Sequence, residues 1–321
     1  KKNNNDNTNQ NIDGQQMKSL RIATRESPLA LWQAEFVRDQ LQRHHESLEI
    51  ELVGMTTQGD QWLSSPLSEV GGKGLFIKEL EQAMRLGRAD IAVHSVKDLP
   101  AKLPEGFILP VIGFRADQHD VLVSAKGDLE HLPEGARVGS SSLRRQAQLL
   151  HHRPDLKMSS IRGNVGTRLA KLDQGEFDAI VLAAAGLQRL GLARQDVYPI
   201  STDLCLPAPG QGALGIECVA DSPALQLLQP LVDTQTERCV RAERGVSAGL
   251  GADCALPVAA MASAIDTDVI VLRALVADAS GTKILQAHAS GQQPEDVAKE
   301  VVEQLFSAGA QQVLDDIRDR R

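Results

Sequence analysis

Aromatic side chains are scarce in this sequence, because Phe, Trp and Tyr together make up only 3% of its 321 residues. Proteins that bind single-stranded nucleic acids stack the bases on aromatic rings, so we expect no such surface here. An excess of positive charge is also lacking, since 42 acidic residues outnumber 34 lysines and arginines and give a net charge of -8. Both absences argue against a nucleic acid as the partner.

Long hydrophobic runs and paired cysteines are missing as well. No stretch of about 18 consecutive apolar residues is present, so we expect no membrane-spanning helix and no membrane partner. No two cysteines have Cys-x-x-Cys spacing, and no histidine lies near them in a zinc pattern, so no metal ion is expected. We interpret the cysteines as reduced thiols of a cytoplasmic protein. They are Cys205, Cys218, Cys239 and Cys254.

The length of the chain allows two or three domains with hydrophobic cores of their own. The hydrophobic content of 42% and the charged content of 24% are ordinary for a globular protein. Residues 1–16 are rich in Asn and Gln and lack the apolar centre of a signal peptide. We therefore expect a disordered extension before Met17.

Strands and helices are expected to alternate through the first two thirds of the chain, which predicts an α/β fold with largely parallel sheets. A late strand at 213–218 follows a segment rich in Pro and Gly and could return to the first sheet. After about residue 222 the pattern changes to helix, three strands and helix, which indicates a small α+β domain. The predicted domains are 17–114 plus 212–231, 115–211, and 232–321.

The segment from Ala89 to Pro100 begins as a buried strand and ends in polar residues. In open α/β sheets, ligands bind at the carboxyl ends of the strands. Asp98 is the only carboxylate in this polar end, and Lys97 precedes it. The alternative interpretation is a simple turn before Pro100, in which Asp98 would bond its own backbone.

Positive charge is concentrated between residues 137 and 172, where Asp155 is the only acidic residue. Several of the arginines stand at expected helix starts, where free backbone N–H groups already favour anions. Arginine adds a planar fork that fits a carboxylate or a phosphate. No nucleotide-binding glycine motif has the required spacing, so many separate carboxylates are the better ligand. The alternative is a solvated basic surface with weak salt bridges. The basic residues are Arg137, Arg144, Arg145, Arg153, Lys157, Arg162, Arg168 and Lys171.

Cys254 differs from the other cysteines because it lies in an expected loop that also contains Gly249 and Gly251. A thiol in such a loop is less shielded than one in a strand and could be a nucleophile or an attachment point. The alternative is a small side chain that fills a gap in the core.

Six sequence blocks, taken in order, closely resemble the porphobilinogen deaminase family. They are RIATRESPLA (21–30), GGKGLF (71–76), VHSVKD (93–98), GSSSLRR (139–145), RGNVGTR (162–168) and PGQG (209–212). The resemblance extends from Leu20 to about Leu314. It implies two α/β domains of the periplasmic-binding-protein type, with the active site between them, and a third, small α+β domain.

The resemblance also implies an activity and a cofactor. Enzymes of this family are transferases that condense four porphobilinogen molecules head to tail, release ammonia at each addition and give the linear tetrapyrrole hydroxymethylbilane. By resemblance, the chain is a cytoplasmic monomer of haem biosynthesis that carries a dipyrromethane cofactor on Cys254 through a thioether bond. Each pyrrole carries an acetate and a propionate, which would account for the many arginines.

The family resemblance assigns roles to individual residues as follows. Asp98 is the expected catalytic carboxylate. The expected cofactor-binding residues besides Cys254 are Ser95, Lys97, Ser141, Arg144, Arg145, Arg162 and Gly163. The expected substrate-binding residues are Arg25, Ser27, Lys73, Arg162, Arg168 and Arg189. Two other interpretations are an inactive relative and a non-catalytic anion-binding module. The first conflicts with the presence of Asp98 and Cys254. The second leaves the third domain without a role, and no signal peptide supports it.

Overall fold

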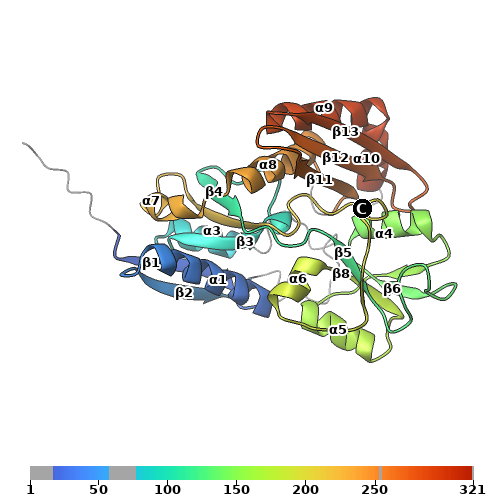
Figure 1. The fold of residues 1–321 in the computed structure, drawn as a ribbon, viewed down its shortest axis with the longest axis horizontal. Helices are drawn as coiled ribbons and strands as arrows, with labels where there is room; N and C mark the ends of the chain where they lie inside the picture. Colours follow the sequence, from blue (N-terminus) through green and yellow to red (C-terminus); the bar gives the residue numbers. More distant parts are fainter. Residues whose placement is uncertain (1–16, 58–76, 253–254, 320–321) are drawn as a thin grey trace, which may run out of the picture.

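The computed structural model describes residues 17–57, 77–252 and 255–319, which form three sheets with their covering helices (Figure 1). The first sheet has the strand order β2-β1-β3-β10-β4. Its strands are β1 (Ser19–Arg25), β2 (Glu49–Met55), β3 (Ile91–Ser95), β4 (Phe107–Gly113) and β10 (Leu214–Val219). The helices α1 (Pro28–His44) and α3 (Lys78–Arg85) pack against this sheet.

The start of α1 follows from its local sequence. Pro28 occupies the first helical turn, and the Ser27 hydroxyl accepts a hydrogen bond from the backbone N–H of Ala30. Helical spacing places Ala34, Val37 and Leu41 on one buried face, in the same core as β1 and β3. Burial of this face fixes the helix over the sheet and leaves its first turn at the carboxyl end of β1.

The first sheet is mixed, whereas the sequence predicted a largely parallel one. β1 is parallel to β2 and β3, but β10 is antiparallel to both β3 and β4. The chain leaves this sheet after β4, builds the second sheet and returns as β10. The late strand therefore lies beside β3 and supports the segment that carries Asp98.

The second sheet has the strand order β7-β6-β8-β5-β9. β6 is parallel to β7 and β8, and β5 is antiparallel to β8 and β9. The strands are β5 (Asp120–Val123), β6 (Arg137–Gly139), β7 (Lys157–Ser159), β8 (Ala179–Ala183) and β9 (Val197–Pro199). The helices of this unit are α4 (Leu143–His152), α5 (Val165–Asp173) and α6 (Ala184–Arg189).

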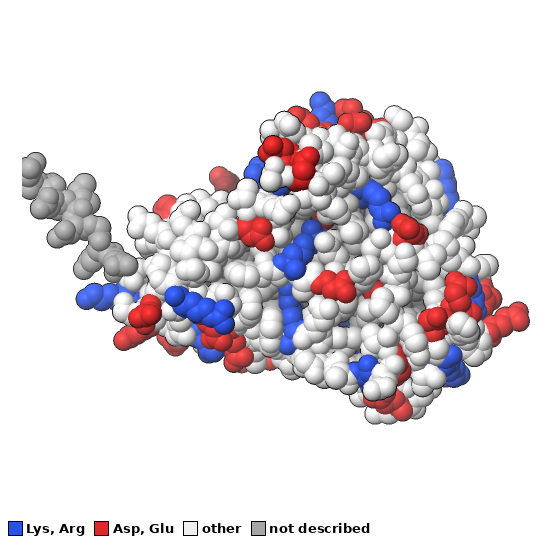
Figure 2. All heavy atoms as spheres, in the orientation of Figure 1, with Lys and Arg blue, Asp and Glu red and all other residues white. Residues whose placement is uncertain are grey.

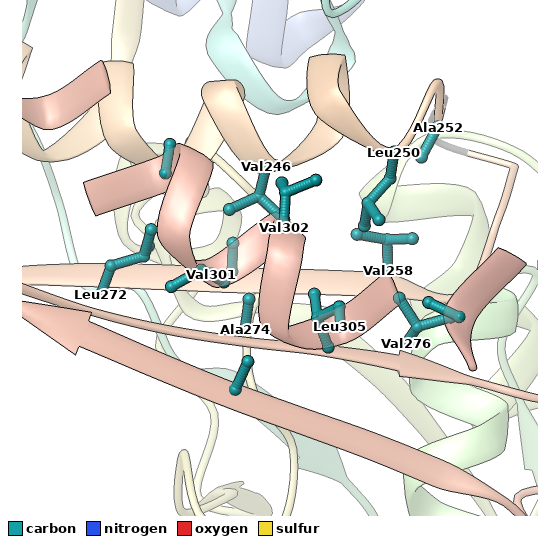
Figure 3. Close-up of a cluster of buried hydrophobic side chains, with 14 of the residues drawn as sticks. Val246, Leu250, Ala252, Val258, Leu272, Ala274, Val276, Val301, Val302 and Leu305 are labelled. Carbon is teal, nitrogen blue, oxygen red and sulfur yellow. The ribbon is translucent and has the colours of Figure 1, made fainter. Parts of the chain in front are cut away.

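The third unit is a three-stranded antiparallel sheet covered by helices. Figure 3 shows Val246 of α8, Leu250 just after this helix, and Val301 and Leu305 of α9 in one buried cluster with Leu272, Ala274 and Val276 of the sheet. The elements are α8 (Thr234–Gly249), β11 (Val258–Ala264), β12 (Ile270–Ala277), β13 (Ile284–Gly291), α9 (Pro294–Ser307) and α10 (Ala310–Arg318). Short helices α7 (Leu225–Leu228) and η2 (Gln229–Leu231) precede α8. The expected fold class is confirmed, since two α/β units are followed by a small α+β unit.

Buried polar contacts join the three units where the chain crosses between the first two. Glu243 of α8 is fully buried and accepts hydrogen bonds from Arg115 (2.9 Å) and from the backbone N–H of Gly210 (2.7 Å). Arg115 and Gly210 belong to the two connections between the first and second sheets. The third unit thus holds both connections in place. Within the described ranges, no helix is long and apolar enough to cross a membrane.

Candidate active site

Asp98 lies at the end of a tightly held turn. β3 ends at Ser95, and a single turn of 3-10 helix, η1 (Val96–Asp98), carries the chain to Pro100. Gly210, at φ +75°, approaches so closely that a Cβ atom there would lie 2.6 Å from Cγ1 of Val96. The Asp98 side chain is exposed, and its carboxylate accepts no hydrogen bond from any residue that the structure describes. The turn predicted as the alternative is present, but the Asp98 side chain does not cap it.

A cavity of about 260 Å³ lies beside this turn, and all three units contribute to its wall. Asp98 is the only carboxylate among the described residues that line it. The lining cations are Lys97, Arg144, Arg145, Arg168 and Arg244. On the face drawn in Figure 2, basic side chains lie in the middle of the molecule, below the third unit, with acidic side chains beside them. The predicted meeting of one carboxylate with several cations is therefore present in the geometry.

A second, smaller cavity of about 70 Å³ adjoins Asp98 from the side of the first sheet. Arg25, at the end of β1, and Ser27, the N-cap of α1, line it together with Ser95. The Ser95 hydroxyl accepts a hydrogen bond of 2.8 Å from the Gln33 side chain. Asp98 lines both cavities, so a group bound in either one can reach the same carboxylate.

Arg144 and Arg145 line the larger cavity, but both are already paired with Asp120 at the start of β5. Arg144 Nη1 lies 2.7 Å from one carboxylate oxygen of Asp120, and Arg145 Nη2 lies 2.7 Å from the other. Gln211 donates a further hydrogen bond of 2.9 Å to Asp120. Burial would raise the pKa of Asp120, but the two guanidinium groups hold it far below its usual range. Part of the positive charge predicted for a ligand is therefore neutralised within the protein.

We expect Asp120→Asn to destabilise the protein strongly. The amide would leave two buried guanidinium groups without a counter-charge, and such a loss costs about 3–5 kcal/mol. Urea unfolding followed by circular dichroism measures this change. Asp128→Asn is the matched control, because the charge of the half-exposed Asp128 pairs only with His131, and an asparagine oxygen can still accept the backbone N–H groups of Glu130 and His131. A free energy of unfolding equal to that of the control would contradict the structural role of Asp120.

Lys97 and Arg168 are cations of the cavity that have no carboxylate hydrogen-bonded to them in the described part of the chain. Burial and the nearby Arg145 lower the pKa of Lys97 to about 8. Burial and the same arginine also lower the pKa of Arg168, whose Nε donates to the Gly163 carbonyl at 2.8 Å. Mutual repulsion of these charges makes an anionic ligand favourable here.

The structure does not place every expected site residue at a cavity. Arg189 is buried and donates to the carbonyls of Gly212 (2.6 Å) and Phe114 (3.4 Å), so it joins the two connections between the sheets. Arg162 and Gly163 come just before α5 and line neither of the two cavities. Gly163, at φ +111°, has no room for a Cβ, which would lie 2.8 Å from Thr167. The expected residues Lys73 and Cys254 lie outside the described residues.

Ser141 lines the larger cavity, yet its hydroxyl is engaged with the backbone of Ile161. It donates to the carbonyl at 2.6 Å and accepts from the N–H at 3.0 Å. This pair of bonds joins the segments that follow β6 and β7. Ser141 therefore holds the cavity wall in shape.

Sequence reasoning missed the part of the cavity wall that the third unit provides. Arg244 and Ser247 of α8 line the cavity, and so does Ala252, which precedes Cys254 by two positions. Arg244 lies far outside the arginine-rich window. Arg244 and Ser247 are three positions apart, which places both on one face of a helix. This polar helix face was the available sign of a binding surface in the sequence.

Comparison with known proteins agrees with this geometry. The family model described as the porphobilinogen deaminase, dipyrromethane cofactor binding domain matches residues 20–226, and the model of the C-terminal domain of the same family matches residues 237–307. Two relatives from strains of Acidithiobacillus ferrooxidans are both named porphobilinogen deaminase. Each is 49% identical over 94% of this chain and 99% of its own length.

Solved structures add only a weak similarity. The periplasmic aliphatic sulphonate binding protein SsuA of Escherichia coli has a TM-score of 0.38 and 15% identity, over 72% of this chain and 70% of its own. The family models cover most of the chain and the relatives match nearly all of it, so this chain belongs to the porphobilinogen deaminase family.

Proposed function

We propose that this chain is the transferase that condenses four porphobilinogen molecules head to tail into hydroxymethylbilane, with release of ammonia at each addition. One observation carries the proposal: the described residues that line the larger cavity include five cations and a single carboxylate, Asp98. Each pyrrole of the substrate brings two carboxylates, which the cations can bind. The reacting centre becomes cationic, which requires one negative charge nearby.

The described residues fit a dipyrromethane cofactor, the group that the matched family domain binds. Lys97 and Arg168 have no carboxylate hydrogen-bonded to them among those residues, and the cavity extends to Ala252, two positions before Cys254. When bound, the cofactor supplies the pyrrole carbon onto which the chain is built. We propose Cys254 as its attachment point through a thioether bond.

Asp98 would act on the substrate. The bond between the aminomethyl carbon and nitrogen of porphobilinogen breaks, its electron pair leaves on ammonia, and a cation remains. The Asp98 carboxylate stabilises this cation and accepts hydrogen bonds from pyrrole N–H groups. A new C–C bond then forms between this cationic carbon and a pyrrole ring carbon, and Asp98 assists removal of the proton that the ring carbon carried. Because the carboxylate has no hydrogen-bond donor among the described residues, its charge remains available for these steps.

The cations hold the acid side chains. Lys97 is adjacent to Asp98 in the chain and its amine, with a pKa lowered to about 8, still carries most of its charge at neutral pH. A bound carboxylate would raise that pKa again, so binding and protonation of Lys97 support one another. Arg25 and Ser27 would bind substrate acids in the smaller cavity, on the other side of Asp98.

Three further assignments accompany the proposed function. We place the protein in the cytoplasm, since the cysteines were interpreted as reduced thiols. We also expect a monomer whose partner is the small molecule porphobilinogen. The domains are 17–114 plus 212–231, 115–211 and 232–321. The pairing of β10 with β3 and β4 supports the discontinuous first domain.

Stoichiometry tests the proposed function. Purified protein mixed with excess porphobilinogen is expected to consume four substrate molecules and release four ammonia molecules for each hydroxymethylbilane formed. Enzymatic assay of ammonia and chromatography of the product measure both quantities. Binding of porphobilinogen without ammonia release would instead identify a non-catalytic binding module.

A further inference from the structure

We infer that Arg244, on α8 of the third unit, binds a carboxylate of the growing pyrrole chain in the cavity that contains Asp98. This inference rests on the proposed function and adds a binding residue to it. Arg244 is half-buried and lines the cavity, together with Ser247 one helical turn further along α8. It is the only arginine from the third unit among the described lining residues.

The hydrogen bonds of Arg244 leave part of its guanidinium group available. Its Nη2 donates to the carbonyls of Pro100 (2.9 Å) and Ala101 (3.2 Å). Within the described ranges, neither Nε nor Nη1 of Arg244 has a hydrogen-bond partner. A guanidinium group has donors in a fork that matches a carboxylate, so two donor positions remain for a ligand.

No carboxylate of the described chain neutralises Arg244 directly. The one carboxylate that acts on its charge is Glu217, and Glu217 is bonded to His94 with 2.7 Å between Nε2 and Oε2. Arg144 and Arg145, by contrast, share Asp120. Arg244 is therefore a half-buried cation whose direct partners are carbonyl groups, which favours the binding of an anion beside it.

The carbonyl partners of Arg244 also determine where a bound carboxylate would lie. Pro100 and Ala101 come directly after the turn that carries Asp98, and Leu99 and Ala101 line the same cavity. Arg244 is thus fixed to the segment that positions the proposed catalytic residue. A pyrrole acid held by Arg244 would keep the attached ring in the cavity that Asp98 faces.

The test compares Arg244→Gln, Arg244→Lys and the control Arg241→Gln. Arg241 lies on the same helix but is exposed and pairs with Glu295 (2.6 Å) on the surface. Loss of a charged hydrogen-bonding partner is expected to raise KM for porphobilinogen about tenfold or more in Arg244→Gln, with a smaller effect on kcat. Arg244→Lys keeps the charge, so the rise in the logarithm of its KM should be at most half of the rise in Arg244→Gln. Arg241→Gln should match the unsubstituted protein.

A second readout follows the growing chain itself. After mixing with one equivalent of porphobilinogen, intact mass spectrometry counts the protein molecules that hold zero, one, two or three added units. In Arg244→Gln, protein molecules with one particular number of added units are expected to accumulate. Arg241→Gln should show the same distribution as the unsubstituted protein. The inference would be overturned if Arg244→Gln had a KM within twofold of that of the unsubstituted protein and an unaltered distribution of added units. It would also be overturned if Arg244→Lys were as impaired as Arg244→Gln. Absence of any added units in the unsubstituted protein would instead refute the proposed function.

Discussion

Asp98→Ala is expected to abolish nearly all turnover while the protein stays folded. The substitution removes the only carboxylate that the described residues contribute to the cavity. Loss of an electrostatic stabiliser that also assists proton transfer reduces kcat by about 10³-fold or more. The side chain is exposed and has no hydrogen-bond donor in the described part of the chain, so its removal should leave the melting temperature almost unchanged. Steady-state kinetics together with calorimetry measure both effects.

Two comparisons make the Asp98 result specific. Asp98→Asn keeps the size of the side chain without its charge and should be nearly as inactive as Asp98→Ala. Asp128→Ala removes an exposed carboxylate on the surface of the second unit and should retain full activity. Near-normal turnover of Asp98→Ala would remove this residue from the proposed mechanism.

Cys254→Ser is expected to remove the covalent cofactor and all turnover with it. A hydroxyl is a far weaker nucleophile than a thiolate, so no thioether or equivalent ether bond should form. Intact mass spectrometry should then give the mass of the amino-acid sequence alone. The same protein without the substitution should exceed its sequence mass by one dipyrromethane.

Cys239→Ser is the matched control for the attachment point. Cys239 is buried on α8, and its burial raises the pKa of the thiol, which makes it a poor nucleophile. The other described cysteines behave alike, since burial raises the pKa of Cys205 to about 12 and that of Cys218 to about 11. Cys239→Ser should therefore retain the extra mass. Loss of that mass in Cys239→Ser, or its persistence in Cys254→Ser, would contradict the assignment of Cys254.

Much of the fold could be predicted because local patterns coincide with tertiary packing. In α1, Ser27 and Pro28 mark the start of the helix, and the apolar spacing predicts the face that is buried. β4 was missed because Pro110 interrupts its apolar run, and proline is typical of edge strands such as this one. The antiparallel direction of β10 could not be predicted from its sequence, because direction depends on the whole path of the chain.

The site could be predicted in part for a similar reason. The polar end of β3 stands at the carboxyl edge of its sheet, which made Asp98 and Lys97 candidates from position, with a simple turn as the alternative. Their proposed roles came from the family resemblance. The partners of the arginines were not recognisable, because Asp120 lies 24 residues before Arg144 and outside the basic window. Arg244 was missed because only folding brings α8 of the third unit against the segment after Asp98. Sequence patterns thus identify charged residues but not which of them neutralise one another.

A protein that builds a tetrapyrrole on a covalently bound primer, with Asp98 at the reacting centre as proposed, must gain mass with each added unit. Intact mass spectrometry of the unsubstituted protein, before and shortly after addition of porphobilinogen, tests it most directly. We predict a starting mass that exceeds the sequence mass by one dipyrromethane. After addition of substrate, the mass should rise in equal steps of one porphobilinogen minus ammonia, and Asp98→Ala should not show these steps. A protein that stays at its sequence mass and gains no such steps, although freshly made with the cofactor available, would contradict both the covalent primer and the proposed function.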